Sequence, residues 1–266
     1  MAVAIVMAGA CGRMGRRILE LAGSADDVAI GGAFDLPDNV GRELHLGTET
    51  GHPRTVIVGE AASEIAHGDV LIDFTAPAAC IANVRTAVVE GKPAVVGTTG
   101  LTEAQVAELR KFAETVAIVY APNMSVGVNL LFKLVHEVAG ILGLDYNVEI
   151  VELHHNLKKD SPSGTAVRLA ERVAEGLGLD YATQTAHGRE GIVGERPRAE
   201  IGMHAVRGGD IVGEHTVSFI GQGERIELVH KAHSRDNFAR GALVAAKFAA
   251  TAAPGLYDMQ DVLGLK

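Results

Sequence analysis

The densest group of chemically active side chains lies in one short segment, Glu152–Thr165. His154, His155, Lys158 and Lys159 fall within six residues of this otherwise acidic chain. A histidine beside lysines is expected to titrate low and to be ready for proton transfer near neutral pH. The segment therefore predicts a site that transfers a proton to an anionic substrate.

A helix is expected to begin directly after this basic run. Ser161 is placed to cap the helix, and Pro162 is placed to occupy its first position. The backbone N–H groups of Ser163, Gly164 and Thr165 would then lack partners within the helix, which makes an anion site. Together these features suit a carboxylate-bearing substrate that must gain a proton.

Other interpretations of this segment stay open. A solvated run of surface charge is the commonest origin of such clusters, although it would not need Pro-Ser-Gly-Thr at a helix start. Metal binding is disfavoured, because the sequence has no H-E-x-x-H pattern, and His230 and His233 lie on an expected strand without nearby cysteines. A Walker-type phosphate loop is also absent from the sequence. We expect no metal.

A glycine-rich turn near the N-terminus is the second chemical feature. Gly9, Gly12 and Gly15 lie between an expected strand and an expected helix. Glycines there permit a tight turn and let a pyrophosphate approach the free N–H groups of the helix start. The spacing departs from a strict G-x-G-x-x-G, because Ala10 holds the first position, so a simple tight turn stays possible.

Asp35 strengthens the dinucleotide interpretation. It ends the second expected strand, 20 residues after Gly15, where an acid would bond the adenosine ribose hydroxyls. The competing interpretation is a surface aspartate in a turn. A 2′-phosphate would favour an arginine beside this acid, but the next residue is Leu36. We expect NADH to be preferred, with NADPH possible because Arg13, Arg16 or Arg42 could still reach a phosphate.

Strands and helices alternate through the first half of the chain. Strands are expected at Val3–Ala8, Val28–Phe34, Thr55–Val58, Val70–Phe74, Ala94–Gly97 and Val116–Tyr120. Helical patterns occupy Arg13–Ala22, Pro77–Val89 and Thr102–Phe112, the last opening on a capping box of Thr102 and Gln105. This alternation predicts an α/β fold with a Rossmann-type, doubly wound parallel sheet over residues 1–124. Gly97–Gly100 and Ala121–Met124 follow strands of that sheet, where such sheets bind ligands.

A second domain, residues 125–235, is expected after this point. Its elements are a helix at Ser125–Leu142, a strand at Asn147–Leu153, a helix from about Pro162 to Gly176, and strands at Ile201–Arg207, Ile211–Ile220 and Arg225–His233. The short connections between the last strands predict a largely antiparallel sheet in an α+β domain with a mixed or antiparallel sheet. The final helix, Asp236–Ala252, and residues 236–266 are expected to pack back on the first domain.

Composition limits the possible functions. The chain has 266 residues, of which 47% are hydrophobic, and a net charge of −9. The apolar content excludes disorder, and the acidity argues against nucleic-acid binding. Two cysteines, Cys11 and Cys80, are too few for a disulfide framework or a cysteine zinc site. No signal-peptide pattern occurs, and the longest uncharged run, Thr115–Phe132, contains Pro122 and Asn123. We expect a cytoplasmic protein that binds no membrane.

These motifs resemble those of the dihydrodipicolinate reductases (4-hydroxy-tetrahydrodipicolinate reductases) of bacterial and plant lysine biosynthesis. The most specific part is E-x-H-H-x-x-K-x-D-x-P-S-G-T, which is matched from Glu152 to Thr165. The resemblance covers nearly the whole chain. Further similar motifs are Gly9–Gly15, Asp73–Thr75, Gly97–Gly100, Asn123–Gly127 and Gly209–Thr216.

The resemblance implies a role for each matched residue. It implies that His154 and Lys158 are the catalytic proton donors. His155 with Ser163, Gly164 and Thr165 would bind the dicarboxylate substrate. The implied dinucleotide contacts are Gly9, Ala10, Cys11, Gly12, Arg13, Met14, Asp35, Gly97, Thr98, Thr99, Ala121, Pro122, Asn123 and Met124.

The resemblance also implies a reaction and an assembly. The reaction is the NAD(P)H-dependent reduction of 4-hydroxy-tetrahydrodipicolinate to tetrahydrodipicolinate in the diaminopimelate and lysine pathway. The assembly is a homotetramer formed through the second domain's sheet. Many family members carry arginine after the ribose-binding acid, whereas this chain has Leu36. Two alternatives are another two-domain NAD(P)-dependent amino-acid or semialdehyde dehydrogenase, and a silent dinucleotide sensor.

Overall fold

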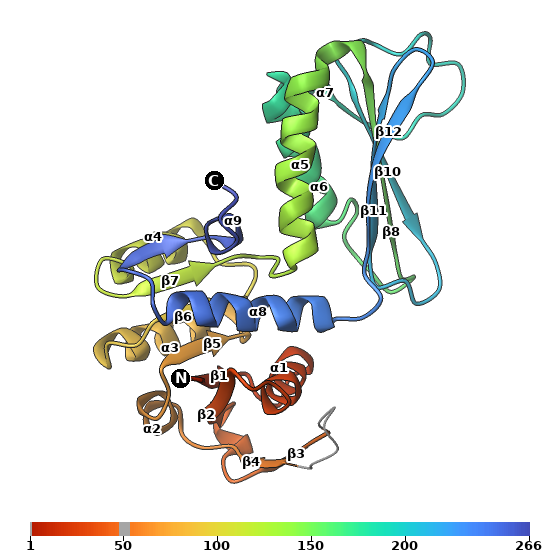
Figure 1. Cartoon of the computed structure of the whole chain (residues 1–266). Coiled ribbons are helices and arrows are strands. Elements are labelled where there is room, and N and C mark those ends of the chain that lie inside the picture. Colours follow the sequence, from red (N-terminus) through yellow and green to blue (C-terminus); the bar gives the residue numbers. More distant parts are fainter. Residues whose placement is uncertain (1, 48–53) are drawn as a thin grey trace. The chain divides into compact units, whose positions relative to one another are not determined.

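The computed structural model describes residues 2–47 and 54–266 and divides the chain into two compact units (Figure 1). Unit 1 comprises Met1–Val126 and Asp236–Lys266, and unit 2 comprises Gly127–Arg235. The first boundary thus lies two residues beyond the one expected from the sequence. Each unit has its own apolar core.

Unit 1 contains a six-stranded parallel sheet in the order β13-β7-β6-β5-β1-β2. Its strands are β1 (Val3–Ala8), β2 (Val28–Phe34), β5 (Val70–Asp73), β6 (Ala94–Val96), β7 (Ala117–Tyr120) and β13 (Gly255–Tyr257). Its helices are α1 (Arg13–Gly23), α2 (Ala61–Ala66), α3 (Pro77–Val89), α4 (Glu103–Phe112), α8 (Asp236–Ala249) and α9 (Met259–Val262), with a 3-10 turn at Pro37–Asn39. The Rossmann-type sheet predicted from the sequence is confirmed.

The strands of this sheet are apolar on both faces because helices cover both (Figure 1). Ile5 and Met7 of β1 join the core that includes α1 and α8. Val6 and Ala8 join the core on the other face, formed with α2, α3 and α4. The predicted capping box of α4 is present, since Thr102 and Gln105 each bond the other's backbone N–H.

The strand expected at Thr55–Val58 forms one residue earlier, but it is not a buried strand of the parallel sheet as expected. β4 (Arg54–Ile57) pairs antiparallel with β3 (Glu43–Leu46) in a separate two-stranded sheet. Ile57 is 62% exposed. A short β-branched run predicts a strand but cannot tell which sheet the strand joins.

The last long helix, α8, lies along the sheet of unit 1 (Figure 1). Arg17 of α1 ties its first residue in place, with Nε and Nη2 donating to the Asp236 carboxylate at 2.6 and 2.7 Å. Gly241 lies against the backbone of Met124, where an added Cβ would be 1.7 Å from the carbonyl oxygen. Only glycine permits this approach.

Unit 2 contains a mixed five-stranded sheet in the order β12-β11-β8-β10-β9. Its strands are β8 (Asn147–His154), β9 (Thr185–His187), β10 (Ile201–Arg207), β11 (Glu214–Ile220) and β12 (Arg225–Lys231). Its helices are α5 (Val126–Leu142), α6 (Gly164–Leu177) and α7 (Tyr181–Gln184), with a 3-10 turn at Gly143–Asp145. The α+β class with a mixed sheet is confirmed.

The prediction of antiparallel neighbours from short connections is correct for β11 and β12 and wrong for β10. β11 runs antiparallel to both β8 and β12. β10 instead runs parallel to β8 and β9, and β8 lies between it and β11. Sequence proximity therefore did not give the strand order.

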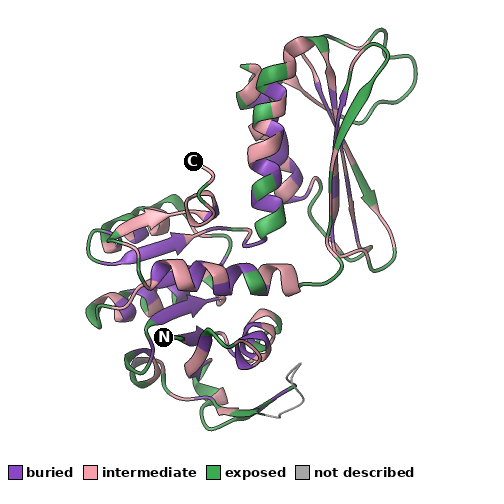
Figure 2. Cartoon of the chain, viewed as in Figure 1, coloured by how far each residue is buried: buried purple, intermediate pink, exposed green. Residues whose placement is uncertain are grey.

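One face of this sheet is covered and the other is not (Figures 1 and 2). Val148 and Ile150 of β8 are buried against α5 and α6, whereas Glu149 and Val151, which alternate with them along the strand, are only partly buried. By length and mean hydropathy (1.4 over Val126–Asp145), α5 with its following turn could cross a membrane. Its buried Val128, Leu131 and Val135 belong to the core of unit 2, which accounts for its apolar character.

The close approach of α8 predicts opposite effects for two glycine-to-alanine substitutions. Gly241→Ala should lower the free energy of unfolding by about 1–3 kcal/mol or more, because the backbone must move to admit a methyl group. Gly140→Ala in α5 should raise it by about 0.5–1 kcal/mol, because alanine is the better helix former and the nearest atom lies at an ordinary contact distance of 3.5 Å. Denaturant unfolding of both variants tests this, and equal effects would contradict the close packing.

Candidate active site

The carboxyl edge of the unit 1 sheet brings the predicted dinucleotide residues together. The loops at this edge are Gly9–Gly12 after β1, Asp35 after β2, Phe74–Thr75 after β5, Gly97–Thr99 after β6 and Ala121–Met124 after β7. The strand order turns back between β5 and β1, and ligands bind at such a switch point in open parallel sheets.

A cavity of about 980 Å³ lies at the part of this edge formed by β1, β2 and β5, and its lining includes Gly9, Gly12, Asp35 and Thr75. Gly9 has a φ of +83°, and a Cβ there would lie 2.6 Å from the Phe74 carbonyl oxygen. Gly12 precedes α1 and supplies no side-chain cap. The first N–H groups of α1 therefore suit the phosphate oxygens of a dinucleotide.

Asp35 is held beside the glycine-rich turn. Its Oδ2 accepts the Cys11 N–H at 2.9 Å, and its Oδ1 accepts from the Leu36 N–H and Asn39 Nδ2, both at 2.8 Å. Among the described residues Oδ2 has only the Cys11 donor and therefore keeps acceptor capacity for a ribose hydroxyl. Leu36 is 68% exposed, and Arg42 lies nearby, with Nη1 donating to Asn39 Oδ1 at 3.3 Å.

Asp73 is a buried acid beneath this edge whose role was not predicted. It is fully buried at the end of β5 and accepts from Thr75 Oγ1 and Thr98 Oγ1, both at 2.7 Å, and from Asn83 Nδ2 at 2.8 Å. The Thr98 hydroxyl is therefore used within the protein, while Thr99 is exposed. The signal in the sequence was an acid at the end of the apolar run Val70–Phe74.

Three of the other predicted contacts could offer a ligand only their backbone. The side chains of Ala10, Ala121 and Met124 are buried in the apolar core of unit 1. Asn123 Oδ1 accepts the Ser125 N–H at 2.9 Å, which closes the turn after β7. Arg13 and Pro122 are exposed, and Met14 is partly buried.

Unit 2 brings His154 and Glu152 together at the end of β8, where both side chains lie on the buried face. His154 Nδ1 is 2.6 Å from Glu152 Oε2. Arg207 of β10 donates to both carboxylate oxygens at 2.8 Å, and the Ser163 N–H donates to Oε1 at 2.9 Å. Burial alone would raise the pKa of Glu152, but these donors outweigh it, so the pKa is lowered and the buried carboxylate is ionised.

The pKa of His154 is lowered, mainly by burial. The hydrogen bond and negative charge of Glu152 oppose this, while the positive charges of Lys158 and Arg207 lower the pKa further. The expected low titration is thus found, but its main cause is burial and the neighbouring lysine contributes less. A largely neutral imidazole near neutral pH suits proton transfer.

The loop after β8 is attached to the segment before β11 by backbone bonds. The His155 N–H donates to the Ile211 carbonyl at 2.8 Å, and the Asn156 N–H to the Gly209 carbonyl at 3.2 Å. The Lys158 side chain is 20% exposed, and its Nζ lies 3.0 Å from Asp160 Oδ1. Nδ1 of His155 is buried and has no hydrogen-bond partner in the described part of the chain.

The predicted helix cap is wrong by two residues. Ser163, and not Ser161, is the N-cap, with its Oγ accepting the Ala166 N–H at 3.2 Å, and α6 begins at Gly164. The Ser163 N–H is used by Glu152, so it does not serve the anion site as expected. Gly164 opens the helix with no atom within 4 Å of where a Cβ would lie, which leaves room for a carboxylate.

His215 of β11 completes the group and was not singled out in the sequence. Its Nε2 lies 3.1 Å from Ser163 Oγ, and its ring meets His154 edge to face with centroids 5.2 Å apart. Burial chiefly lowers the pKa of His215 to about 3, so the ring is neutral. Glu152, His215 and Arg207 each lie in or near a motif that resembles those of the reductases. That their side chains meet could not be predicted without the order of the strands in the sheet.

Comparison with known proteins identifies the family. The model of the dihydrodipicolinate reductase N-terminus matches residues 3–124, and that of the C-terminus matches residues 127–263. The chain belongs to the dihydrodipicolinate reductase family. It is therefore an oxidoreductase of a pyridine-nucleotide-dependent family.

Relatives of this reductase family are similar over their full length. The 4-hydroxy-tetrahydrodipicolinate reductase of Citrifermentans bemidjiense is 52% identical over 99% of this chain and 100% of its own. The enzyme of the same name from Geobacter sulfurreducens is 51% identical over 98% of this chain and 99% of its own. A dipicolinate-bound dihydrodipicolinate reductase from Paenisporosarcina sp. TG-14 shares the fold, with a TM-score of 0.76 and 23% identity over 98% of this chain and 99% of its own.

Amino-acid and semialdehyde dehydrogenases, the alternative considered from the sequence, share the fold at lower similarity. Diaminopimelate dehydrogenase of C. glutamicum has a TM-score of 0.53 at 12% identity over 97% of this chain and 93% of its own. An aspartate semialdehyde dehydrogenase from Vibrio cholerae has a TM-score of 0.51 at 11% identity, over 94% of this chain and 97% of its own. These likenesses concern the fold alone.

Proposed function

We propose that this chain reduces 4-hydroxy-tetrahydrodipicolinate to tetrahydrodipicolinate with NADH or NADPH, in the diaminopimelate and lysine pathway. The observation that carries the proposal is the arrangement of unit 2, where a buried, acid-bonded His154 and Lys158 accompany the open helix start at Gly164. The full-length similarity to reductases of that name supports the same conclusion.

Unit 1 is proposed to hold the dinucleotide. The N–H groups at the start of α1 would take the pyrophosphate, and Asp35 would take the adenosine ribose hydroxyls. Gly97–Thr99 and Ala121–Met124 lie along the same edge of the sheet, and their backbones would contact the rest of the dinucleotide. When bound, the reduced nicotinamide supplies a hydride.

Unit 2 is proposed to hold the dicarboxylate and to supply the proton. The N–H groups of Gly164 and Thr165 would bind one carboxylate, with His155 assisting. After loss of the 4-hydroxyl as water, the substrate is a cyclic conjugated imine that accepts hydride at C4. Charge then shifts along the conjugated system, and the adjacent carbon takes a proton from the His154 and Lys158 site. Fixing the ring by its carboxylates lowers the barrier through positioning.

The second candidate is a dehydrogenase for an amino acid or its semialdehyde. The shared fold of such enzymes favours it. The histidine and lysine beside an open helix start favour the reductase, because reduction of a conjugated dicarboxylate needs both a proton donor and an anion site.

We also propose a cytoplasmic homotetramer assembled through the open face of the unit 2 sheet. Strand register places Val206, Ile220 and Val229 on the face opposite to α5 and α6. They are 43%, 37% and 48% exposed. Apolar side chains of this kind on an uncovered sheet face suit burial against other copies of the chain.

Substitution of Lys158 tests the proposed chemistry. With the preceding synthase supplying substrate, Lys158→Ala should lower kcat by roughly 10²–10⁴-fold, the usual contribution of a positioned proton donor. Lys159→Ala, which removes the exposed neighbouring lysine, should leave kcat near the wild-type value. Unchanged kcat in Lys158→Ala would refute the role.

The choice of substrate tests the second candidate. Oxidation of NADH by aspartate semialdehyde or an oxo acid with ammonia, without the synthase, would favour it.

Cofactor choice can be tested at Leu36. We expect a higher kcat/KM with NADH than with NADPH, because no arginine follows Asp35. Leu36→Arg should shift the ratio toward NADPH by placing a cation where a 2′-phosphate would lie. Leu36→Gln changes the side chain without adding charge and should leave the ratio near its original value. A clear preference of the wild-type enzyme for NADPH would contradict the expectation.

The assembly is tested by charging its proposed interface. Val229→Lys should shift the sedimentation coefficient from that of a tetramer to that of a smaller species, because a lysine resists burial in an apolar interface. Ile141→Lys on α5 introduces the same charge at an 81% exposed position and should leave the assembly intact. A wild-type monomer in solution, or a tetramer unaffected by Val229→Lys, would speak against this interface.

A further inference from the structure

We propose that Glu152, held by Arg207, is a positioning residue that determines which ring nitrogen of His154 carries the proton. The inference rests on the proposed function in one respect only, namely that His154 exchanges a proton with substrate. Its geometric basis is the contact of 2.6 Å between His154 Nδ1 and Glu152 Oε2.

An ionised carboxylate can only accept hydrogen bonds. Glu152 is fully buried, and Arg207 reaches both of its oxygens at 2.8 Å, so it is kept in the charged form. His154 Nδ1 must then carry the hydrogen of the shared bond. In the neutral ring Nε2 is left as the nitrogen that gains and loses the exchangeable proton.

The Nε2 edge of His154 is kept open by a glycine. A Cβ on Gly213 would lie 3.0 Å from Nε2, so any side chain there would crowd the nitrogen. On another side the His215 ring packs edge to face and adds no charge, because it is buried and neutral. In the described part of the chain, the ionisable groups that act on His154 are Glu152, Lys158, Arg207 and His215.

Glu152 also sets the position of the proposed carboxylate site. Its Oε1 accepts the N–H of Ser163, and Ser163 is the N-cap of α6. The proton donor and the helix start at Gly164 are therefore both positioned by one carboxylate. A change at Glu152 should act on proton transfer and on substrate geometry without any direct contact with the substrate.

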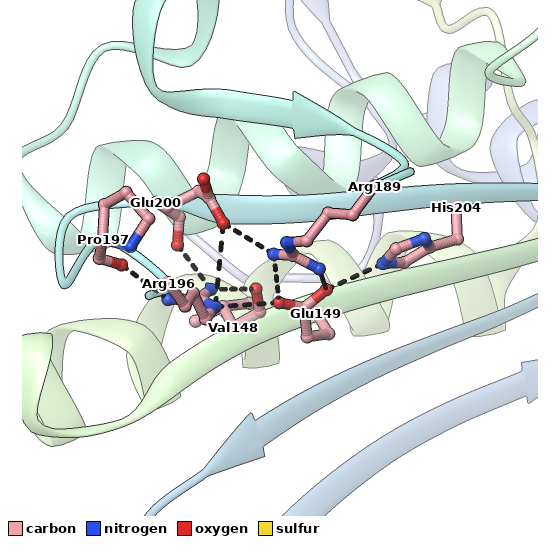
Figure 3. Close-up of polar contacts among 7 residues, drawn as sticks. All are labelled: Val148, Glu149, Arg189, Arg196, Pro197, Glu200 and His204. Carbon is pink, nitrogen blue, oxygen red and sulfur yellow. Dashed lines mark hydrogen bonds and ion pairs between the residues drawn. The ribbon is translucent and has the colours of Figure 1, made fainter. Parts of the chain in front are cut away.

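Glu149 provides a matched control on the same strand (Figure 3). It lies on the opposite face of β8 and is also held by arginines and a histidine. Arg189 and Arg196 donate to Oε1 at 2.8 and 2.9 Å, and His204 Nε2 lies 2.8 Å from Oε2. Burial alone would raise the pKa of Glu149, but these partners outweigh it and lower the pKa to about 2. Its chemistry matches that of Glu152, but it does not touch His154.

Glu152→Gln makes a specific prediction about the tautomer of His154. An amide NH₂ at the Oε1 position would face two donors, the Ser163 N–H and Arg207 Nη2. At the Oε2 position it would face only one, Arg207 Nη1, and could donate to His154 Nδ1. The second orientation is favoured because it leaves fewer buried donors unpaired. The hydrogen of neutral His154 should then move from Nδ1 to Nε2.

The experiment is two-bond ¹H–¹⁵N NMR on histidine-labelled protein, with His154→Gln used to assign the signal. Neutral His154 should carry its hydrogen on Nδ1 in the wild type and in Glu149→Gln, and on Nε2 in Glu152→Gln. The wild-type spectrum is informative even if Glu152→Gln fails to fold. An Nε2–H tautomer in the wild type, or no change in a folded Glu152→Gln, would overturn the proposal.

Kinetics provide the second measurement. Glu152→Gln should lower kcat by about 10–100-fold, as loss of an orienting partner commonly does. The decline in rate at high pH should begin at lower pH, because loss of the carboxylate removes an influence that raises the pKa of His154. Glu149→Gln should retain the wild-type pH profile, and an unaltered profile in Glu152→Gln would overturn the proposal. If the wild type does not reduce the synthase product, the proposed function is wrong. The NMR measurement of the His154 tautomer still tests the role of Glu152 in that case.

Discussion

A buried negative charge is the constraint on which the organisation of unit 2 depends. An ionised carboxylate removed from water is stable only when several donors reach it. Glu152 satisfies this condition with Arg207, His154 and the Ser163 N–H, which come from β10, β8 and the start of α6. Ser163 extends the group to His215 on β11. The register of three strands and the position of one helix are therefore coupled to a single side chain.

Unit 1 uses the same principle at the carboxyl edge of its parallel sheet. Asp73 collects donors from the ends of β5 and β6 and from α3, so the loops that follow these strands are fixed to one another. Glu149 does so on the face of the unit 2 sheet opposite to Glu152, where it binds Arg189 and Arg196 of the loop between β9 and β10. In each case the acid binds backbone or side chains that local pattern alone would leave variable.

The sequence predicted the parts of this structure that depend on local pattern. β1 and β2 begin and end at the expected residues, and the capping box of α4 is present, because each follows from residues adjacent in the chain. The position of β10 beside β8 depends on pairing between distant segments, which short connections do not specify. The cap of α6 shows the same limit. Ser161 and Ser163 are both suitable caps, and what distinguishes them is the demand of Glu152 for the Ser163 N–H.

The two cations whose charges act on His154 differ in availability: Lys158 belongs to the basic segment of this acidic chain, and Arg207 lies on β10. Arg207 is committed, because its partner Glu152 is fully buried and separating them would leave a buried charge unpaired, at a cost of about 3–5 kcal/mol. Lys158 pairs with Asp160, whose side chain is 61% exposed, and such a pair contributes only about 0–1 kcal/mol. Water can replace Lys158 at Asp160, so Lys158 can turn to a substrate at little cost. The arrangement thus separates the two charges by role: the arginine holds the acid that orients the histidine, and the lysine is left exchangeable for an anionic ligand.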